Sequence, residues 1–159
     1  MLEPLDDSEN AARYVGGLNF DPVTKRVNIE AFDRGVKDAD GLSFTRTGML
    51  AEEQNADDSM IRKIMGSRLA IGKNAVFAVV KVGDAILSLS HFGMKFEFVA
   101  DPLEEDGAKL ANPAHALLLG LPFKGESVGS LNSELAGDLL VRAVNRLFWA
   151  HSDKSDEQL

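Results

Sequence analysis

The sequence contains no cysteine among its 159 residues. Disulfides, thiolate nucleophiles, cysteine-ligated zinc sites and iron–sulfur clusters are therefore excluded. No hydrophobic run reaches the length of about 18 residues that a membrane span requires, and the first residues lack the basic and apolar regions of a secretory signal. These absences predict a cytoplasmic protein that does not associate with a membrane.

The sequence patterns of several enzyme and metal-binding classes are also missing. Gly72 and Lys73 lack the preceding glycine and the following hydroxyl residue of a phosphate-binding P-loop, and G-x-S-x-G, a pattern of serine hydrolases, does not occur. The three histidines show no metal-ligand spacing, and residues 37–41 carry only part of a calcium-binding loop. We therefore expect no metal and no cofactor, although a triad built from distant residues would leave no such pattern.

The net charge of −8 is concentrated at the ends of the chain. Residues 1–10 carry four acidic side chains and no basic one, and residues 151–159 carry three acidic side chains and one lysine. Charge runs at chain ends are usually solvated tails, so we predict flexible acidic tails over residues 1–12 and 151–159 and a single domain over 13–150. Nucleic-acid binding requires clustered lysine and arginine, so a nucleic-acid partner is not expected.

Hydrophobic patterning predicts several strands. Residues 75–82 are almost continuously apolar, which is typical of a strand in the interior of a sheet. Apolar and polar residues alternate over 27–31, 42–46 and 96–100, as they do in strands with one buried face. Residues 116–120 fit either a short buried strand or one turn of helix.

Helical spacing of apolar residues predicts two helices and leaves another segment ambiguous. Residues 57–69 begin with two aspartates that suit a helix N-terminus, and residues 132–148 form a long amphipathic pattern. Residues 84–92 fit a strand after a hairpin turn or a short helix ended by Gly93, and the poor strand propensity of alanine and serine favours the helix. The predicted fold class is therefore α+β, with a mixed or antiparallel sheet covered by the long C-terminal helix and a shorter central helix.

His115 is the histidine best placed for chemistry. It follows the turn-forming pair Asn112–Pro113 and precedes an apolar run, where a loop meets the edge of a sheet. A neutral imidazole beside a carboxylate suits general acid–base catalysis, and a structural histidine in satisfied contacts is the alternative. His91, the second candidate, is expected as a partly buried ring at the end of an element, and His151 as a cation favoured by the dipole at the end of the last helix.

Arg46 and Trp149 are the remaining candidates. Arg46 lies between two threonines and before a glycine, so its planar guanidinium could hold a carboxylate or a phosphate. Alternatively, Arg46 pairs with Glu52 or Glu53. Trp149 lies near the end of the last predicted helix, either in the core or as an anchor on a binding surface. Nine phenylalanines against one tyrosine and one tryptophan indicate that aromatic residues serve mainly in packing.

Three short segments connect this sequence with a protein family. They are Leu42–Phe44 within a short strand, Gly93–Pro102, and above all Asn112–Gly120, with the sequence NPAHALLLG. Through these segments, and most specifically through Asp-Pro followed by Asn-Pro-Ala-His-Ala, residues 20–121 resemble small bacterial proteins of uncharacterised activity. The resemblance implies a bacterial protein and draws attention to His115, and it implies no activity, cofactor or partner.

Two functions remain open from the sequence. The first is a non-catalytic protein-binding module, an immunity-type, inhibitory or adaptor subunit whose acidic ends meet a basic partner and speed association; a homo-oligomer is also compatible with it. The second is a small enzyme acting on a phosphate- or ribose-containing substrate, with His115 as acid–base and Arg46 as anion clamp. The second function requires His115, Arg46 and a carboxylate or His91 to converge in one pocket.

Overall fold

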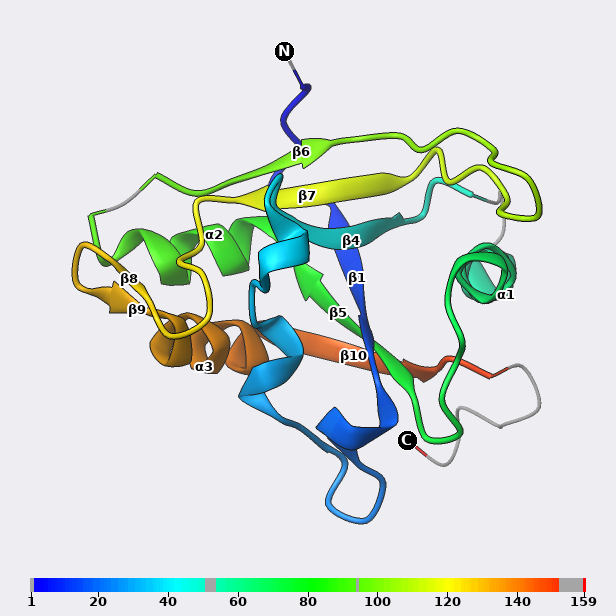
Figure 1. Cartoon of the computed structure of the whole chain (residues 1–159), viewed down its shortest axis with the longest axis horizontal. Coiled ribbons are helices and arrows are strands. Elements are labelled where there is room, and N and C mark those ends of the chain that lie inside the picture. The colour runs from blue at the N-terminus through cyan, green and yellow to red at the C-terminus, as the bar shows by residue number, and fades with distance from the viewer. Residues whose placement is uncertain (1, 51–53, 94, 152–158) are drawn as a thin grey trace.

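The computed structural model describes residues 2–50, 54–93, 95–151 and 159, with the backbone alone for residues 54–56. Its centre is a six-stranded sheet in the order β10-β5-β1-β4-β7-β6, in which every pair of neighbours is antiparallel (Figure 1). The α+β class is thus confirmed, with the antiparallel form of the sheet. The sheet strands are β1 (Asn10–Val15), β4 (Leu42–Thr47), β5 (Val76–Lys81), β6 (Glu97–Ala100), β7 (His115–Leu119) and β10 (Val144–Trp149).

Three helices and two short hairpins complete the fold. The helices are α1 (Gln54–Arg68), α2 (Val82–Ser90) and α3 (Ser133–Ala143). The hairpins pair β2 (Phe20–Asp21) with β3 (Arg26–Val27), and β8 (Ser127–Val128) with β9 (Leu131–Asn132). No helix in the described part of the chain is long and apolar enough to cross a membrane.

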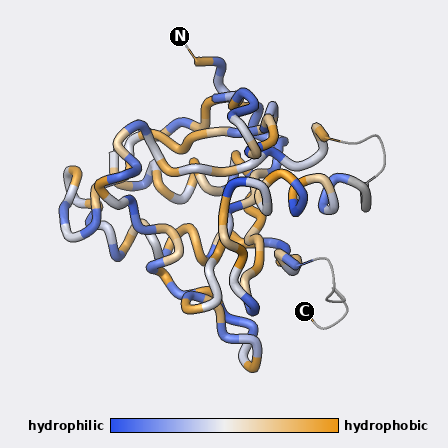
Figure 2. The backbone as a smooth tube through the Cα atoms, turned by 45° about the vertical axis from the view of Figure 1, so that its right-hand side comes forward, coloured by the Kyte–Doolittle hydropathy of each residue, from blue (hydrophilic) through white to orange (hydrophobic). Residues whose placement is uncertain are grey.

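The sheet carries a hydrophobic core on each of its faces. Along β5, Val76, Ala78 and Val80 belong to a core cluster that also contains residues of α2 and α3, whereas Phe77 and Val79 belong to a second cluster that contains Ile61 of α1. Figure 1 accordingly shows α2 and α3 together on one side and α1 on the other. Along much of the tube in Figure 2, hydrophobic and hydrophilic positions alternate, as expected for elements with one buried face.

The ambiguous segment 84–92 is a helix, as the amino-acid propensities favoured. Helix α2 buries Val82, Ala85 and Leu89, which follow helical spacing. Gly93 has φ +71°, the left-handed conformation that glycine adopts at little cost just beyond a helix. His91 therefore lies at the C-terminus of α2, and the hairpin alternative is wrong.

The long C-terminal helix predicted over 132–148 is wrong in its second half. Helix α3 ends at Ala143, and residues 144–149 form β10, which pairs with β5 through a bulge between Val144 and Arg146. Leu147 and Trp149 contact the core on the α2 and α3 side, whereas Phe148 contacts the core beneath α1. Consecutive apolar residues thus pack against both faces of an edge strand. Pairing with the sheet overrides a spacing of apolar residues that also fits a helix.

The predicted N-terminal tail over 1–12 is also wrong in part. Residues 10–12 belong to β1, an interior strand of the sheet, and Ala11 is completely buried. Further upstream, the Leu5 N–H donates to the carbonyl of Phe98 (2.9 Å), and the Ala100 N–H donates to the carbonyl of Glu3 (2.7 Å). The N-terminal segment therefore covers the outer edge of β6, because the backbone groups of an edge strand seek hydrogen-bond partners.

Among the remaining predictions, one strand is wrong over most of its length and the other elements differ from the structure at their ends. Interior strand β5 and strands β4, β6 and β7 are confirmed. The strand predicted over 27–31 stops at Val27, and a 3₁₀ turn over Ile29–Phe32 buries Ala31 and Phe32 instead. The helix predicted from Asp57 begins three residues earlier. Most of the predicted C-terminal tail, residues 152–158, lies outside the described residues.

Candidate functional site

A cavity of about 480 Å³ lies between the sheet and α1. It forms where β1 and β4 diverge, because their pairing ends at Ala12 and Thr45 (Figure 1). Helix α1 and the loop between β6 and β7 form the opposite wall. The polar residues that line the cavity include two further charged groups beside the arginines and the histidine: they are Arg13, Lys37, Asp38, Ser43, Thr45, Arg68, Asn112 and His115.

The antiparallel register brings Ser43, Asp101 and His115 together at this cavity. His115 is the cross-strand partner of Thr45 on β4, and the Asp101 N–H donates to the His115 carbonyl from the neighbouring β6 side. Residues opposite one another share a face of the sheet, so the His115 ring lies between strands β4 and β6. Its Nε2 is 3.1 Å from Ser43 Oγ, and its Nδ1 is 2.8 Å from the Asp101 carbonyl oxygen and 3.2 Å from Asp101 Oδ2.

These contacts fix the tautomer of a neutral His115. Both neighbours of Nδ1 are oxygen acceptors, the carbonyl and the carboxylate of Asp101, so Nδ1 carries the hydrogen and donates it. Nε2 then holds a lone pair and accepts from the Ser43 hydroxyl. This arrangement, a serine bonded to a histidine that is in turn oriented by an aspartate, is the geometry in which a base can take the proton of a hydroxyl.

The Arg13 guanidinium lines the same cavity without a carboxylate partner. Its Nε donates to the Ala31 carbonyl (2.9 Å) and its Nη1 to the Ser43 carbonyl (3.0 Å). Among the described residues, no carboxylate lies within ion-pair distance of it. Burial lowers the pKa of Arg13 to about 10, and the more distant carboxylates of Asp38 and Asp33 only partly oppose this effect. Arg13 is therefore a cation at neutral pH, held in place by two main-chain oxygens.

Asn112 fixes the turn that precedes His115. Its side chain is completely buried, donates to Thr45 Oγ1 (3.1 Å) and accepts from the Ala114 N–H (3.2 Å). Because both bonds join the loop to β4 and to the start of β7, the side chain holds His115 beside Ser43. The turn signal seen in the sequence at Asn112–Pro113 therefore has a positioning role in the site.

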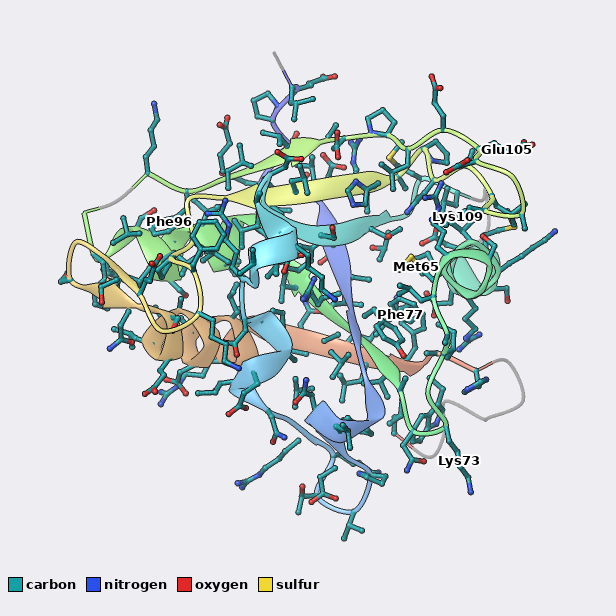
Figure 3. The ribbon with its side chains drawn as sticks, in the orientation of Figure 1. Met65, Lys73, Phe77, Phe96, Glu105 and Lys109 are labelled. Carbon is teal, nitrogen blue, oxygen red and sulfur yellow. The ribbon has the colours of Figure 1, made fainter. Side chains whose placement is uncertain are left out.

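Arg68 joins α1 to the loop that covers the cavity. Its Nε donates to the Leu110 carbonyl (2.8 Å) and its Nη2 to the Glu104 carbonyl (2.9 Å), while the Leu110 N–H donates to Ser67 Oγ (2.9 Å). Figure 3 shows Met65 on α1 on the sheet side of the helix and Lys109 in the loop close to it. The loop that covers part of the cavity is thus hydrogen-bonded to α1.

Arg46 is not in the cavity. It lies on β4 on the same side as Leu42 and Phe44, and its Nε and Nη2 are 2.7 and 2.6 Å from Glu9 Oε1. The guanidinium therefore already holds a carboxylate of its own chain. The predicted alternatives Glu52 and Glu53 lie outside the described residues. Arg46 as the anion clamp beside His115 is wrong, since the two side chains lie on opposite faces of the sheet and Arg46 does not line the cavity. Arg13 projects from β1 on the same face as Arg46, but its guanidinium lines the cavity because β1 and β4 diverge next to it.

The other predicted site residues are also separate from His115. His91 is exposed at the C-terminus of α2, and not partly buried as predicted. Trp149 is only 4% exposed and packs edge-to-face on Phe20, so it belongs to the core and is unavailable as a surface anchor. His151 follows a strand rather than a helix, and its Nε2 is 3.2 Å from the Ile71 carbonyl oxygen.

The sequence patterns do not identify three residues of the site, which are Arg13, Ser43 and Asp101. Ser43 alternates with the inward-facing Leu42 and Phe44, which places it on the other face of the strand, but the pattern does not reveal what it meets there. Asp101 and His115 both belong to the segments that carry the bacterial resemblance, and pairing of β6 with β7 brings them into contact. Arg13 belongs to no sequence motif. It is the first residue of the predicted domain, directly after the predicted tail, so its position did not indicate a functional role.

Three comparisons of the chain with known proteins were without a match. No protein-family model, no curated protein and no solved structure matches it. Among the described residues, no group of three or more histidine, aspartate or glutamate side chains is arranged to hold a metal ion. A functional conclusion therefore depends on the geometry of the cavity itself.

Proposed function

We propose that this protein binds a small organic anion, bearing a phosphate or a carboxylate, in the cavity beside α1. The observation that carries the proposal is the Arg13 guanidinium, which lines the cavity and bonds only main-chain carbonyls. Arg13 takes the role that the sequence suggested for Arg46, and His115 remains the acid–base group at the same site. The phosphate-containing substrate expected from the sequence is one member of this ligand class.

The energetics of a buried cation support the proposal. A buried charge without an opposite charge costs folding free energy, and a bound anion offsets that cost. The guanidinium is a planar group whose paired N–H donors match the oxygens of a carboxylate or a phosphate. Two of its donors are engaged by Ala31 and Ser43 on the protein side, and no buried side-chain nitrogen in the described part of the chain lacks a hydrogen-bond partner. Nη2 of Arg13, for which the described residues provide no hydrogen-bond partner, is therefore not completely buried.

The size and lining of the cavity indicate a small-molecule ligand. Its volume of about 480 Å³ falls within the range of roughly 300 to 1,000 Å³ of small-molecule sites. Met65, Leu69 and Leu103 contribute apolar wall opposite the polar strand residues. The combination suits a molecule with one anionic group at Arg13 and an organic part against α1 and its loop.

Ligand titration with paired arginine variants tests the proposal. Inorganic phosphate, ribose 5-phosphate and succinate are titrated into wild type, Arg13→Lys and Arg46→Lys, with binding measured calorimetrically. Lysine keeps the charge but loses the planar pair of donors, so we expect Arg13→Lys to weaken binding at least about tenfold, a change of about 1.4 kcal/mol. Arg46→Lys, the matched control at a paired arginine, should bind as wild type does. Equal affinities for all three proteins, or no binding of any anion to wild type, would contradict the proposal.

A protein-binding function is the second candidate, and one observation favours it. Burial of Leu5 against the sheet fixes the N-terminal segment, and Glu3, Asp6 and Asp7 around it are exposed. An acidic surface held in a fixed place suits a basic partner protein and electrostatically assisted association. Affinity purification of wild type and of a variant with these three residues changed to lysine, in low and high salt, tests it. A partner retained by the charge-reversed variant would exclude this surface as the docking site.

A further inference from the structure

We infer that Ser43 is a nucleophile that accepts an acyl group from an ester whose acyl part ends in an anionic group held by Arg13. The inference rests on the proposed anion site and adds a reaction to it. The substrate class is a half-ester of a short dicarboxylic acid. Three features of the site support it: the activation of the hydroxyl, the position of Arg13 relative to residue 43, and access to the cavity.

The hydroxyl of Ser43 has a base within reach. His115 Nε2 accepts from it at 3.1 Å, and the Asp101 oxygens on the other side of the ring hold the tautomer that leaves Nε2 unprotonated. When the ring takes a proton, the Asp101 carboxylate 3.2 Å from Nδ1 stabilises the resulting imidazolium.

Arg13 determines where an anionic substrate would place its ester. Its Nη1 bonds the main-chain carbonyl of Ser43 itself, and Arg13 and Ser43 line the same cavity, so an anion held there by the guanidinium shares the cavity with the nucleophile. The cavity volume of about 480 Å³ suits a short dicarboxylic half-ester better than a long one. Holding the two ends of the substrate places the carbonyl carbon against Oγ, and positioning of this kind is a major source of rate acceleration.

The Ser43 side chain is accessible from the cavity, whereas the His115 ring beside it is mostly buried. The side chain of Ser43 is half-buried and lines the cavity, whereas the His115 ring is 11% exposed. The nucleophile is thus open to a ligand while its base is shielded from bulk water. A shielded base favours proton exchange with the hydroxyl and the leaving group over exchange with solvent.

The reaction has two balanced stages. In the first, Ser43 Oγ bonds to the ester carbonyl carbon as its proton passes to His115 Nε2; the bond from that carbon to the alcohol oxygen then breaks, and the alcohol leaves with the proton from Nε2. In the second, water adds to the acyl carbon and gives a proton to Nε2, and the bond to Oγ breaks as Ser43 takes that proton back. The net change is ester and water to carboxylic acid and alcohol, with no other co-reactant.

Hydrolysis of two chromogenic esters tests the inference. The mono-4-nitrophenyl ester of succinic acid carries the anionic group, and 4-nitrophenyl acetate lacks it. Because general-base activation and nucleophilic attack are both lost, Ser43→Ala should hydrolyse the succinate half-ester at least about 100-fold more slowly than wild type. Ser90→Ala is the matched control, since Ser90 lies on α2 and its hydroxyl bonds only the Ile86 carbonyl; it should retain the wild-type rate. Arg13→Lys should raise KM for the half-ester by a larger factor than it raises KM for the acetate.

A covalent label and a binding measurement make the outcomes distinct. A fluorophosphonate should add once to wild type, at Ser43 by peptide mapping, and should not add to Ser43→Ala, whose folding is checked by circular dichroism and by succinate binding. Retained succinate binding with lost hydrolysis in Ser43→Ala supports the inference. Hydrolysis unchanged by Ser43→Ala, or a label on another residue, overturns it. Wild type that binds succinate through Arg13 but hydrolyses neither ester overturns the inference and leaves the anion site standing; wild type that does neither overturns both.

Discussion

The Ser43 hydroxyl and the His115 imidazole are 3.1 Å apart although 72 positions separate them in the sequence. Strand β4 pairs with β7, and Thr45 and His115 are direct partners in that pairing. Ser43 precedes Thr45 by two residues on β4 and lies on the same face of the sheet. It is therefore the diagonal neighbour of His115, at a distance that a histidine ring can reach. The contact is therefore a consequence of sheet register, and it occurs where β1 turns away and opens the cavity.

Replacement of Asp101 tests how the ring of His115 is oriented. Asp101→Asn removes the charge beside Nδ1 but keeps the main-chain carbonyl that also accepts from it. Since the ring keeps one acceptor, we expect kcat for the succinate half-ester to fall about tenfold with KM and succinate affinity unchanged. Asp106→Asn, at an exposed loop position, is the control. A parallel change in KM would show that Asp101 acts on ligand binding instead.

The pH dependence of anion binding reports the charge of Arg13. Burial lowers the pKa of Arg13 to about 10, and only the protonated guanidinium attracts an anion. Affinity for ribose 5-phosphate should therefore be constant from pH 8 to about 9 and should fall as pH rises through about 10, by about tenfold per unit once the proton is lost. Arg13→Gln should bind weakly with no such fall. An affinity that is unchanged up to pH 11 in wild type would contradict the assignment.

The lowered pKa of Arg13 also affects folding. Anion affinity should fall as pH rises through this pKa, whereas the folded state should become more stable. The folded protein holds the Arg13 proton less tightly than the unfolded chain, so the charged guanidinium costs folding free energy at all pH values below about 10. That cost is relieved as pH rises from about 10 towards the higher, ordinary pKa of an arginine. A bound anion should reduce the cost at neutral pH, seen as a higher thermal midpoint with succinate in wild type and a smaller rise in Arg13→Lys.

Asn112 should contribute to stability as well as to the site. Asn112→Ala removes a buried hydrogen bond to Thr45 and one from the Ala114 N–H, so we expect the free energy of unfolding to fall by about 1 to 3 kcal/mol in urea titrations. Asn145→Ala, at an exposed position on β10, should change it by less than about 0.5 kcal/mol. Comparable losses in the two variants would show that the buried amide has no special structural role.

Two glycines with positive φ should respond differently to alanine. Gly120 has φ +98°, and a Cβ there would lie 2.6 Å from the Lys95 carbonyl oxygen. Gly125 has φ +80° with nothing within 4 Å of a Cβ. Both alanine variants carry backbone strain of about 1 kcal/mol, but only Gly120→Ala adds a clash with the main chain, so it should unfold at the lower urea concentration. The reverse order would contradict the tight approach of the β6 and β7 ends.

Strands could be predicted from the sequence where the spacing of apolar residues fitted a strand and did not also fit a helix. The continuous apolar run of β5 and the alternation in β4 and β6 have no competing interpretation, and all three strands are confirmed. Residues 144–149 follow Leu140 and Ala143 at helical spacing and also alternate as a strand, so the pattern could not decide between the two. Their conformation depends on the free edge of β5, a partner more than 60 residues away in the chain.

The site could be predicted only in part, for a related reason. His115 was identified from its place between a turn and an apolar run, which is local information. Arg46 was identified as an anion clamp from its neighbours in the sequence, and this interpretation is wrong because Glu9, 37 positions away, bonds its guanidinium. Ser43 and Asp101 likewise become site residues only through the order of β4, β7 and β6 in the sheet.

The central claim is that an anion binds to the Arg13 guanidinium, and the Nε–H resonances of the arginines report this most directly. In a ¹H–¹⁵N spectrum of the arginine side chains, assigned with Arg13→Lys and Arg46→Lys, wild type is titrated with succinate and with ribose 5-phosphate. We expect the Arg13 signal to shift with saturation while the Arg46 signal stays in place, because Glu9 already occupies that guanidinium. An Arg13 signal that does not move at saturating anion, or shifts confined to Arg46 and the exposed arginines, would contradict the proposed site.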